Sequence, residues 1–383
     1  MRGSGQLCRD FIMPGFIIRA RVLPLMSKKP LVLLALLLAG LMVGTAVQGF
    51  VSPTESNTPD EPTLQNVEYT EGDAYANLYD EVIGSVVSVH VGGSPDEASQ
   101  GSGFVYDFDG HIVTNQHVVT DIEEVEIRFS EGDWRHGEVV GTDVYTDLAV
   151  VEVEDVPEYA EPMPLADGNP RQGTPVAALG NPLGLEGSIT QGIVSGVNRS
   201  TQTESDFSIP DTVQTDAGID RGNSGGPLVT LDGEVVGVNR ARQGTSIGFA
   251  VSAALTERVV PDLIHKGSTE HALMGVRSID VSPRVADAND LDEPRGVLVA
   301  ETVDGGPSDG VFVGSEEIEF EGFPMQVGGD VIIGVDGKSI NSHEELSRYL
   351  MLHTEPGQTI DVTIIRDGEQ QTVQVTLGTR PEP

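Results

Sequence analysis

The chain has very little cysteine and very little positive charge. Its only cysteine is Cys8, so an intramolecular disulfide is excluded and the fold must be stabilised by packing. Its 383 residues include 60 acidic and 22 basic side chains, a net charge of −38, and only Lys266 and Lys338 are lysines beyond residue 50. Such an acidic surface repels nucleic acid and anionic lipid, so we expect no nucleic-acid partner. The charge fits a halophilic protein, since concentrated salt screens self-repulsion, but it also fits a merely acidic secreted protein.

Long hydrophobic runs are also scarce, because only residues 31–47 form one, and Lys28 and Lys29 precede it. We interpret residues 1–49 as a signal peptide or a membrane anchor, with either Met1 or Met26 as the true start. Residues 50–74, rich in Pro, Glu, Asn and Thr, predict a flexible acidic linker. The sequence therefore predicts an extracytoplasmic protein, membrane-anchored or secreted, and its length predicts two folded domains beyond this leader.

Short β-rich runs separated by turn residues dominate the next hundred residues. We expect strands at Val82–Val91, Gly103–Tyr106, His111–Thr114, Val125–Phe129 and Leu148–Val153, and a hairpin turn at Asp109-Gly110. Many short strands without a long helical period predict a mainly β fold, a barrel or a sandwich, rather than a parallel α/β sheet.

The stretch Asp220–Pro227 places Ser224 in a glycine-rich turn. Glycines at 222, 225 and 226 permit backbone angles that other residues avoid, so consecutive N–H groups can point at one place beside the Ser224 hydroxyl. Such a turn can hold an oxyanion. Ordinary loops between strands use the same residue types, so the turn alone does not establish a nucleophile.

A serine nucleophile needs a base, and the base needs a carboxylate that orients it. His117 follows a predicted strand, and Asp147 immediately precedes an apolar strand. His117, Asp147 and Ser224 come in the chain order that chymotrypsin-like proteases use. In a double barrel, His117 and Asp147 would lie on the first barrel and Ser224 on the second, with the cleft between.

Six motifs over about residues 75–260 together resemble the HtrA/Deg family of serine proteases. They are Gly101–Phe104, Thr114–Val119, Asp147–Val150, Gly180–Gly184, Gln214–Ala217 with Gly222–Pro227, and Ile247–Val251. Gln116 departs from the asparagine that is common in the family. The resemblance implies a chymotrypsin-like double β-barrel at 75–262, with His117 as general base, Asp147 as its orienting carboxylate and Ser224 as nucleophile. It also implies an oxyanion hole at Gly222, Asn223 and Ser224, formed by the N–H groups of Gly222 and Ser224.

The residues before the nucleophile and on a later strand should line the primary specificity pocket. The predicted substrate-binding residues are Gly218, Ile219, Ile247, Gly248, Phe249 and Ala250, next to Ala217. Gly218 lies six residues before Ser224 and has no carboxylate, so we expect preference for a small or medium aliphatic residue rather than Arg or Lys. Asp220, four residues before Ser224, is the acid that speaks against this interpretation, although its side chain need not face the pocket. Thr190–Val197 should be a strand and Asn198–Asp211 an exposed loop.

After a connector at Lys266–Glu270, residues 271–379 resemble a PDZ domain. The peptide-binding loop would be Leu273, Met274, Gly275 and Val276, whose N–H groups would hold a C-terminal carboxylate. We expect a helix at Ser342–Leu352 with Ser342 as its N-cap, and a hairpin about Asp367-Gly368. An insertion at Val313–Gln326 departs from the family pattern.

The predicted function is an ATP-independent serine endopeptidase that cuts unfolded or damaged proteins outside the cytoplasm and needs no cofactor or metal. The alternative is a peptide-binding chaperone or regulatory protein with the same fold and little turnover. A pure PDZ scaffold would leave the ordered protease motifs unexplained. Expected partners are unfolded substrates and C-terminal peptides, and the resemblance implies a homo-oligomer, a trimer or a multiple of one, assembled near Tyr75–Tyr79.

Overall fold

The computed structural model describes residues 71–92, 99–181, 187–203, 208–220, 222–240 and 247–381. The predicted signal peptide or anchor, and the linker up to residue 70, lie outside the described residues. Within the described ranges, no helix is both long and apolar enough to span a bilayer.

Six antiparallel strands close the first barrel, in the order β1-β2-β3-β6-β5-β4. Their bounds are Val86–Val91 (β1), Ser99–Val105 (β2), His111–Asn115 (β3), Glu124–Arg128 (β4), Trp134–Asp143 (β5) and Leu148–Val153 (β6). Inward-facing side chains such as Val89, Ile112 and Ile127 are fully buried. Exposed and buried residues alternate along β4, as a half-buried strand requires.

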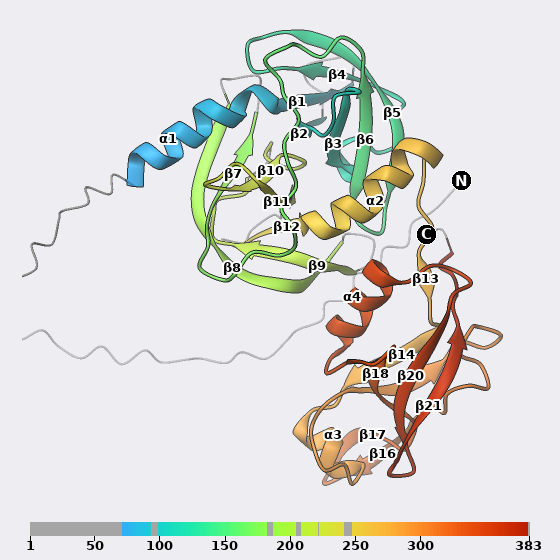
Figure 1. The fold of residues 1–383 in the computed structure, drawn as a ribbon. Coiled ribbons are helices and arrows are strands. Elements are labelled where there is room, and N and C mark those ends of the chain that lie inside the picture. The colour runs from blue at the N-terminus through green and yellow to red at the C-terminus, as the bar shows by residue number, and fades with distance from the viewer. Residues whose placement is uncertain are drawn as a thin grey trace, which may run out of the picture. The chain divides into compact units, whose positions relative to one another are not determined.

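The second barrel is also closed, in the order β10-β11-β12-β9-β8-β7 (Figure 1). Its strands are Pro175–Gly180 (β7), Ser188–Gln202 (β8), Ser208–Thr215 (β9), Pro227–Thr230 (β10), Val235–Arg240 (β11) and Gly248–Ser252 (β12). The predicted mainly β double barrel is confirmed. The expected exposed loop at Asn198–Asp211 is wrong at both ends, because β8 continues to Gln202 and β9 begins at Ser208.

Two helices accompany the barrels. Helix α1 (Glu71–Val82) includes the last residues of the predicted linker and buries Leu78 and Val82. The expected strand at Val82–Val91 is therefore wrong at its start, since β1 begins only at Val86. Helix α2 (Ala253–Lys266) begins where the Ser252 side chain accepts a hydrogen bond from the Leu255 N–H, and it ends at Gly267, which has φ of 78°.

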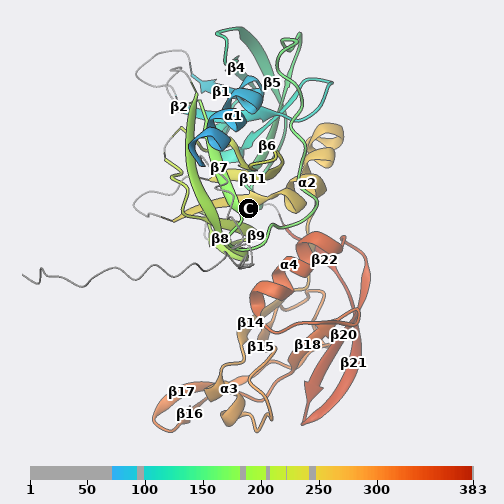
Figure 2. The same cartoon turned by 60° about the vertical axis from the view of Figure 1, so that its left-hand side comes forward.

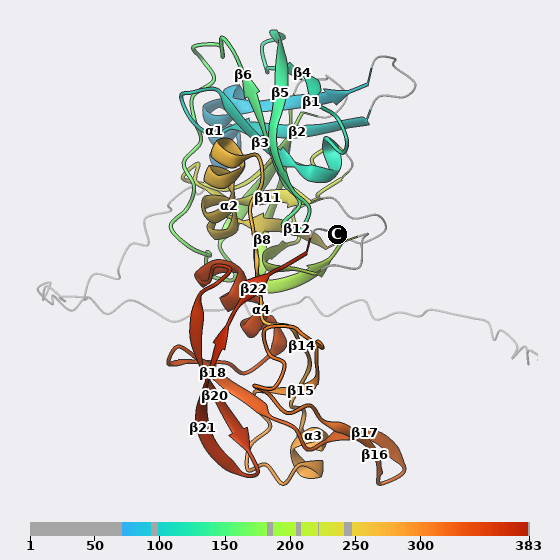
Figure 3. The same ribbon diagram turned by 90° about the vertical axis from the view of Figure 1, so that its right-hand side faces the viewer.

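The C-terminal region is a β-sheet domain with two helices (Figures 2 and 3). Its main sheet has the order β14-β15-β18-β20-β21, and β19 pairs with β18. The bounds are Val276–Asp280 (β14), Val297–Thr302 (β15), Val331–Val335 (β18), Lys338–Ser339 (β19), Thr359–Arg366 (β20) and Glu369–Thr376 (β21), with α3 at Pro283–Ala288 and α4 at His343–His353. Short strands β13 (Ala272–Leu273) and β22 (Gly378–Thr379) pair at its start and end.

Local signals in this region are confirmed. The Ser342 hydroxyl accepts a hydrogen bond from the Glu345 N–H at 3.2 Å at the start of α4. Asp367 and Gly368 have φ of 53° and 77°, as a tight turn between β20 and β21 requires. The insertion forms a hairpin of β16 (Glu316–Phe320) and β17 (Phe323–Val327).

Candidate active site

Strand pairing brings His117 and Asp147 together. Strands β3 and β6 are antiparallel with Asn115 opposite Leu148, so the residues just after β3 lie beside the residue just before β6. His117 lies in a 3-10 turn, η2 (Gln116–Val118), whose Gln116 N–H donates to the Asp147 carbonyl at 3.1 Å. The Asn115 side-chain amide donates to the same carbonyl at 3.0 Å.

The side chains of His117 and Asp147 are hydrogen-bonded. Nδ1 of His117 lies 2.8 Å from Oδ2 and 3.0 Å from Oδ1 of Asp147, and the His117 backbone N–H donates to Oδ1 at 3.0 Å. An ionised carboxylate only accepts hydrogen bonds, so Nδ1 carries the proton and Nε2 is left as an acceptor. The Asp147 side chain is 5% exposed and the His117 side chain 42%, so the carboxylate is buried while the ring reaches solvent.

The turn with Ser224 is tied to the first barrel by a backbone hydrogen bond. The Ser102 N–H donates to the Ser224 carbonyl at 2.8 Å. Gly225 has φ of 85°, and a Cβ there would lie 2.2 Å from the Ser102 carbonyl oxygen and 2.3 Å from Oγ1 of Thr114. Only glycine fits so close an approach. The turn therefore lies against β3, just before the segment that carries His117.

Gly222 and Asn223 are positioned by contacts that the sequence did not reveal. Gly222 has φ of 100°, and its carbonyl accepts a hydrogen bond from the Ser102 hydroxyl at 2.6 Å. The Asn223 N–H donates to the Asp220 carbonyl at 3.0 Å, and Asn223 Oδ1 accepts from the Ser188 hydroxyl at 3.1 Å. Buried Ser102 lies in the Gly101–Phe104 motif, but its role as a support for this turn was not predicted.

A second unpredicted residue, Arg240 at the end of β11, contacts Asp147. Arg240 Nε donates to Asp147 Oδ2 at 2.7 Å, and the Arg240 side chain is only 11% exposed. Asp143, an alternative carboxylate in the same loop, is instead bonded to His271 at 2.9 Å and to Thr146. No local pattern could have shown the Arg240 contact, since it joins a strand of the second barrel to the turn before β6 of the first.

The predicted specificity residues Gly218, Ile219 and Gly248 come together. A Cβ at Gly248 would lie 2.7 Å from Cδ1 of Ile219, so any larger residue at 248 would have to displace the Ile219 side chain. The Thr190 hydroxyl donates to the Gly218 carbonyl at 2.6 Å. Of the other predicted residues, Ile247 is 46% exposed and Ala250 is buried, with half-buried Phe249 between them.

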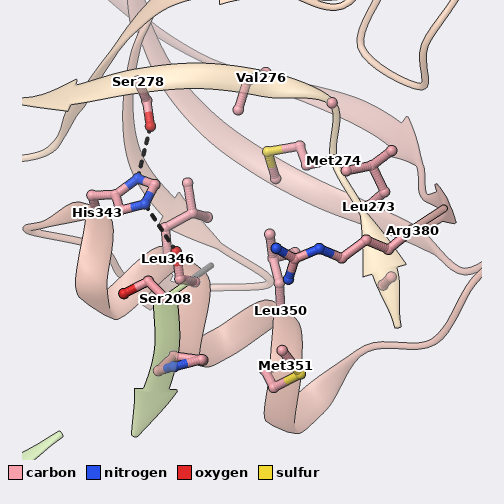
Figure 4. A pocket seen from close by; sticks show the side chains of 14 residues that line it. Ser208, Leu273, Met274, Val276, Ser278, His343, Leu346, Leu350, Met351 and Arg380 are labelled. Atoms are coloured by element: carbon pink, nitrogen blue, oxygen red, sulfur yellow. Dashed lines mark hydrogen bonds between the residues drawn. The ribbon is translucent and has the colours of Figure 1, made fainter. Parts of the chain in front are cut away.

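Leu273, Met274, Gly275 and Val276 all line one pocket of about 320 Å³ (Figure 4). Its opposite wall is helix α4, including Leu346 and Leu350, and Arg380 reaches in from the C-terminal end. Ser208 and Pro210 of β9 also line it, so the protease barrel forms part of the wall. In the described chain, no group of His, Cys, Asp and Glu side chains could hold a metal ion.

Comparison with known families matches two domains. A trypsin-like peptidase domain matches residues 101–238, and a PDZ domain matches residues 272–377.

Relatives and solved structures agree with both matches. A probable periplasmic serine endoprotease, DegP-like, of Halomonas elongata is 36% identical over 299 residues, which are 76% of this chain and 59% of that protein. A protein of the same name from Pseudomonas fulva is 36% identical over 300 residues, 76% of this chain and 58% of the relative. This chain thus spans less than two thirds of their length.

Among solved structures, the HtrA-type protease AlgW with tripeptide has a TM-score of 0.66 at 29% identity, covering 81% of this chain and 98% of AlgW. The serine endoprotease from Yersinia pestis has a TM-score of 0.56 at 28% identity, covering 80% of this chain and 98% of that one. By these matches, the chain has the trypsin-like peptidase domain and the PDZ domain of the HtrA/DegP family of serine proteases.

Proposed function

We propose that this protein is a serine endopeptidase that uses His117, Asp147 and Ser224. The observation that carries the proposal is the buried Asp147 carboxylate bonded to His117 Nδ1 at 2.8 Å, with the Ser224 turn anchored on the same barrel. His117 Nε2 is left to accept the Ser224 hydroxyl proton as Oγ attacks the substrate carbonyl carbon. The protonated ring then gives that proton to the leaving amine. Water hydrolyses the resulting acyl ester by the same route.

The negative charge that develops on the substrate carbonyl oxygen needs donors in place before the reaction. The N–H groups of Gly222 and Ser224, on either side of Asn223, are our candidates. Their support is the Ser102 hydroxyl, which binds the Gly222 carbonyl at 2.6 Å and accepts from the Asn181 N–H at 2.9 Å. This bond fixes the orientation of the Gly222–Asn223 peptide, which lies between the two candidate donors along the chain.

The substrates we propose are extended segments of unfolded or damaged proteins, cut after small or medium aliphatic residues without ATP. The contact between Ile219 and Gly248 supports an apolar lining for the proposed specificity pocket, to which Gly218 would contribute no charge. The groove at Leu273–Val276 would hold C-terminal or extended peptides beside α4. The solved relative AlgW, described with a tripeptide, and the DegP-like endoproteases support a peptide substrate.

The proposal also covers the compartment of the protein, its oligomeric state and its adaptation to salt. The relatives named periplasmic support an extracytoplasmic protein, and residues 1–49 would export or anchor it. We also propose a homotrimer or multiple built around Tyr75–Tyr79 of α1. The net charge of −38 supports adaptation to concentrated salt.

The test is hydrolysis of unfolded casein and of a stably folded protein by wild type, Ser224→Ala and His117→Ala. We expect wild type to cleave only the unfolded substrate, and both variants to lose the activity together, because triad members act as a unit. The alternative, a chaperone with little turnover, predicts that wild type and Ser224→Ala suppress aggregation equally and that neither cleaves.

A further inference from the structure

Asp147 is a buried carboxylate with two cationic or potentially cationic partners on one oxygen. Nδ1 of His117 and Nε of Arg240 lie 2.8 Å and 2.7 Å from Oδ2. The Asp147 side chain is 5% exposed and that of Arg240 11%. Charge-assisted hydrogen bonds between buried groups are short and directional, so the guanidinium restricts the rotation of the carboxylate.

The two partners come from different barrels. Asp147 precedes β6 of the first barrel, whereas Arg240 ends β11 of the second. Nη1 of Arg240 also donates to the Gln202 carbonyl at 3.4 Å at the end of β8, which ties the guanidinium to a second strand of its own barrel. Arg240 therefore connects the barrel of the nucleophile turn to the carboxylate that orients the imidazole.

The nearest other acid along the chain, Asp143 at the end of β5, has its own partners. It is bonded to His271 and to the Thr146 hydroxyl. Among the described residues, His117 and Arg240 are the charged side chains bonded to the Asp147 carboxylate. Within the same described residues, Asp147 is the carboxylate that holds the Arg240 guanidinium.

We propose that Arg240 is a positioning residue of the catalytic centre, which holds the Asp147 carboxylate in line with the His117 ring. The inference rests on the proposed function, since it assigns Arg240 a role in the same triad. The positioning effect follows from the shared Oδ2, because a guanidinium bonded to that atom limits how far the carboxylate can turn away from the ring.

Two variants separate charge from geometry. Arg240→Met keeps much of the side-chain length and removes the charge, and Arg240→Lys keeps the charge but loses the planar fork. Arg135→Met is the matched control, because Arg135 lies on β5 with Asp133 as its ion-pair partner. Thermal melts confirm that each variant is folded.

The measurement is kcat and KM on a short peptide substrate. We expect Arg240→Met to lower kcat by roughly 10- to 100-fold with little change in KM, the scale of a misplaced catalytic group. Arg240→Lys should recover part of the rate, because it keeps the charge but loses the planar fork. Arg135→Met should match wild type.

A kcat of Arg240→Met equal to that of wild type would overturn the proposal, as would a loss of kcat/KM that comes from KM alone. NMR of ¹⁵N-labelled histidine provides a readout that needs no turnover. The His117 ring signals, assigned by their loss in His117→Ala, should shift in Arg240→Met and stay in place in Arg135→Met, because only Arg240 shares the carboxylate with the ring. If wild type does not cleave peptides, the proposed function fails, whereas unchanged His117 signals would refute the role of Arg240.

Discussion

His271 Nε2 lies 2.9 Å from Asp143 Oδ2, and both side chains are at least 94% buried. His271 immediately precedes the first strand of the PDZ domain, and Asp143 lies four residues before Asp147. The pair therefore connects the PDZ domain to the loop of the proposed catalytic carboxylate. Arg348 of α4 adds a second link to the barrels, 2.7 Å from the buried Asp211.

This arrangement predicts different consequences for two neighbouring carboxylates. Asp147→Asn should lower turnover by about 10⁴, because the amide no longer holds the required tautomer of His117. Asp143→Asn should mainly lower stability, since its partner is His271, and breaking a buried pair costs about 3–5 kcal/mol. Peptide hydrolysis and thermal melts of both variants are the measurement. Greater loss of turnover in Asp143→Asn would show that the wrong carboxylate was assigned.

Gly218→Asp should impair cleavage after Val, Ile or Ala, by placing a charge beside the proposed pocket. The change fits sterically, because a Cβ at Gly218 has its nearest neighbour, the Thr190 side chain, at 3.7 Å. Product profiling on a peptide library measures it, with Gly218→Asn as the neutral control of the same size. A wild-type preference for Arg or Lys would refute the pocket.

Three exposed glutamates lie directly opposite one another on adjacent strands, Glu124 with Glu138 and Glu138 with Glu152. Opposed like charges destabilise a sheet, so Glu138→Lys should raise stability by about 1 kcal/mol in dilute buffer. In molar potassium chloride the gain should shrink, because the Debye length falls to ~3 Å. Thermal melts from 0.1 M salt upward test this effect.

Glu317→Lys is the matched control for the salt experiment, since Glu317 faces the neutral Gln326. It makes the same change in net charge without relieving a directly opposed pair. Equal gains in stability in the two variants would show that the effect comes from net charge alone. A wild type equally stable and active at low and high salt would contradict the proposed salt adaptation.

The raised pKa of Tyr349 predicts that the folded state loses stability at alkaline pH. Burial, then the 2.9 Å hydrogen bond to Asp336, raises the pKa of Tyr349 from 10.0 to about 12. The folded state therefore favours the protonated phenol, and the contribution present below pH 10 is lost as pH rises towards 12. The difference in melting temperature between wild type and Tyr349→Phe should shrink over that range. A constant difference would show that this phenol does not contribute.

The sequence was most informative where one local signal determines structure. The N-cap at Ser342 and the Asp367-Gly368 turn follow from nearest neighbours along the chain. Helix α1 was missed although Tyr75, Leu78, Tyr79 and Val82 repeat at helical spacing. Asn198–Asp211 was misread at its start because Asn198, Arg199 and Gln202 lie on the exposed side of the long, bulged strand β8 rather than in a loop.

The catalytic residues of the candidate site could be predicted from sequence motifs, but the residues that hold them in place could not. His117 and Asp147 become neighbours through the β3–β6 register, which their flanking apolar strands already suggested. Ser102 and Arg240 act across the boundary between the barrels, so their roles depend on tertiary packing that no local pattern encodes.

The central claim is that Ser224 is a nucleophile activated by His117, and covalent labelling with diisopropyl fluorophosphate tests it most directly. Attack by Ser224 Oγ on phosphorus would release fluoride and leave a phosphoryl ester, found by mass spectrometry of the tryptic digest. We predict one modification, at Ser224, in folded wild type, and none at that position in His117→Ala. Folded wild type that stays unmodified, or that carries the label at another serine, would contradict the account.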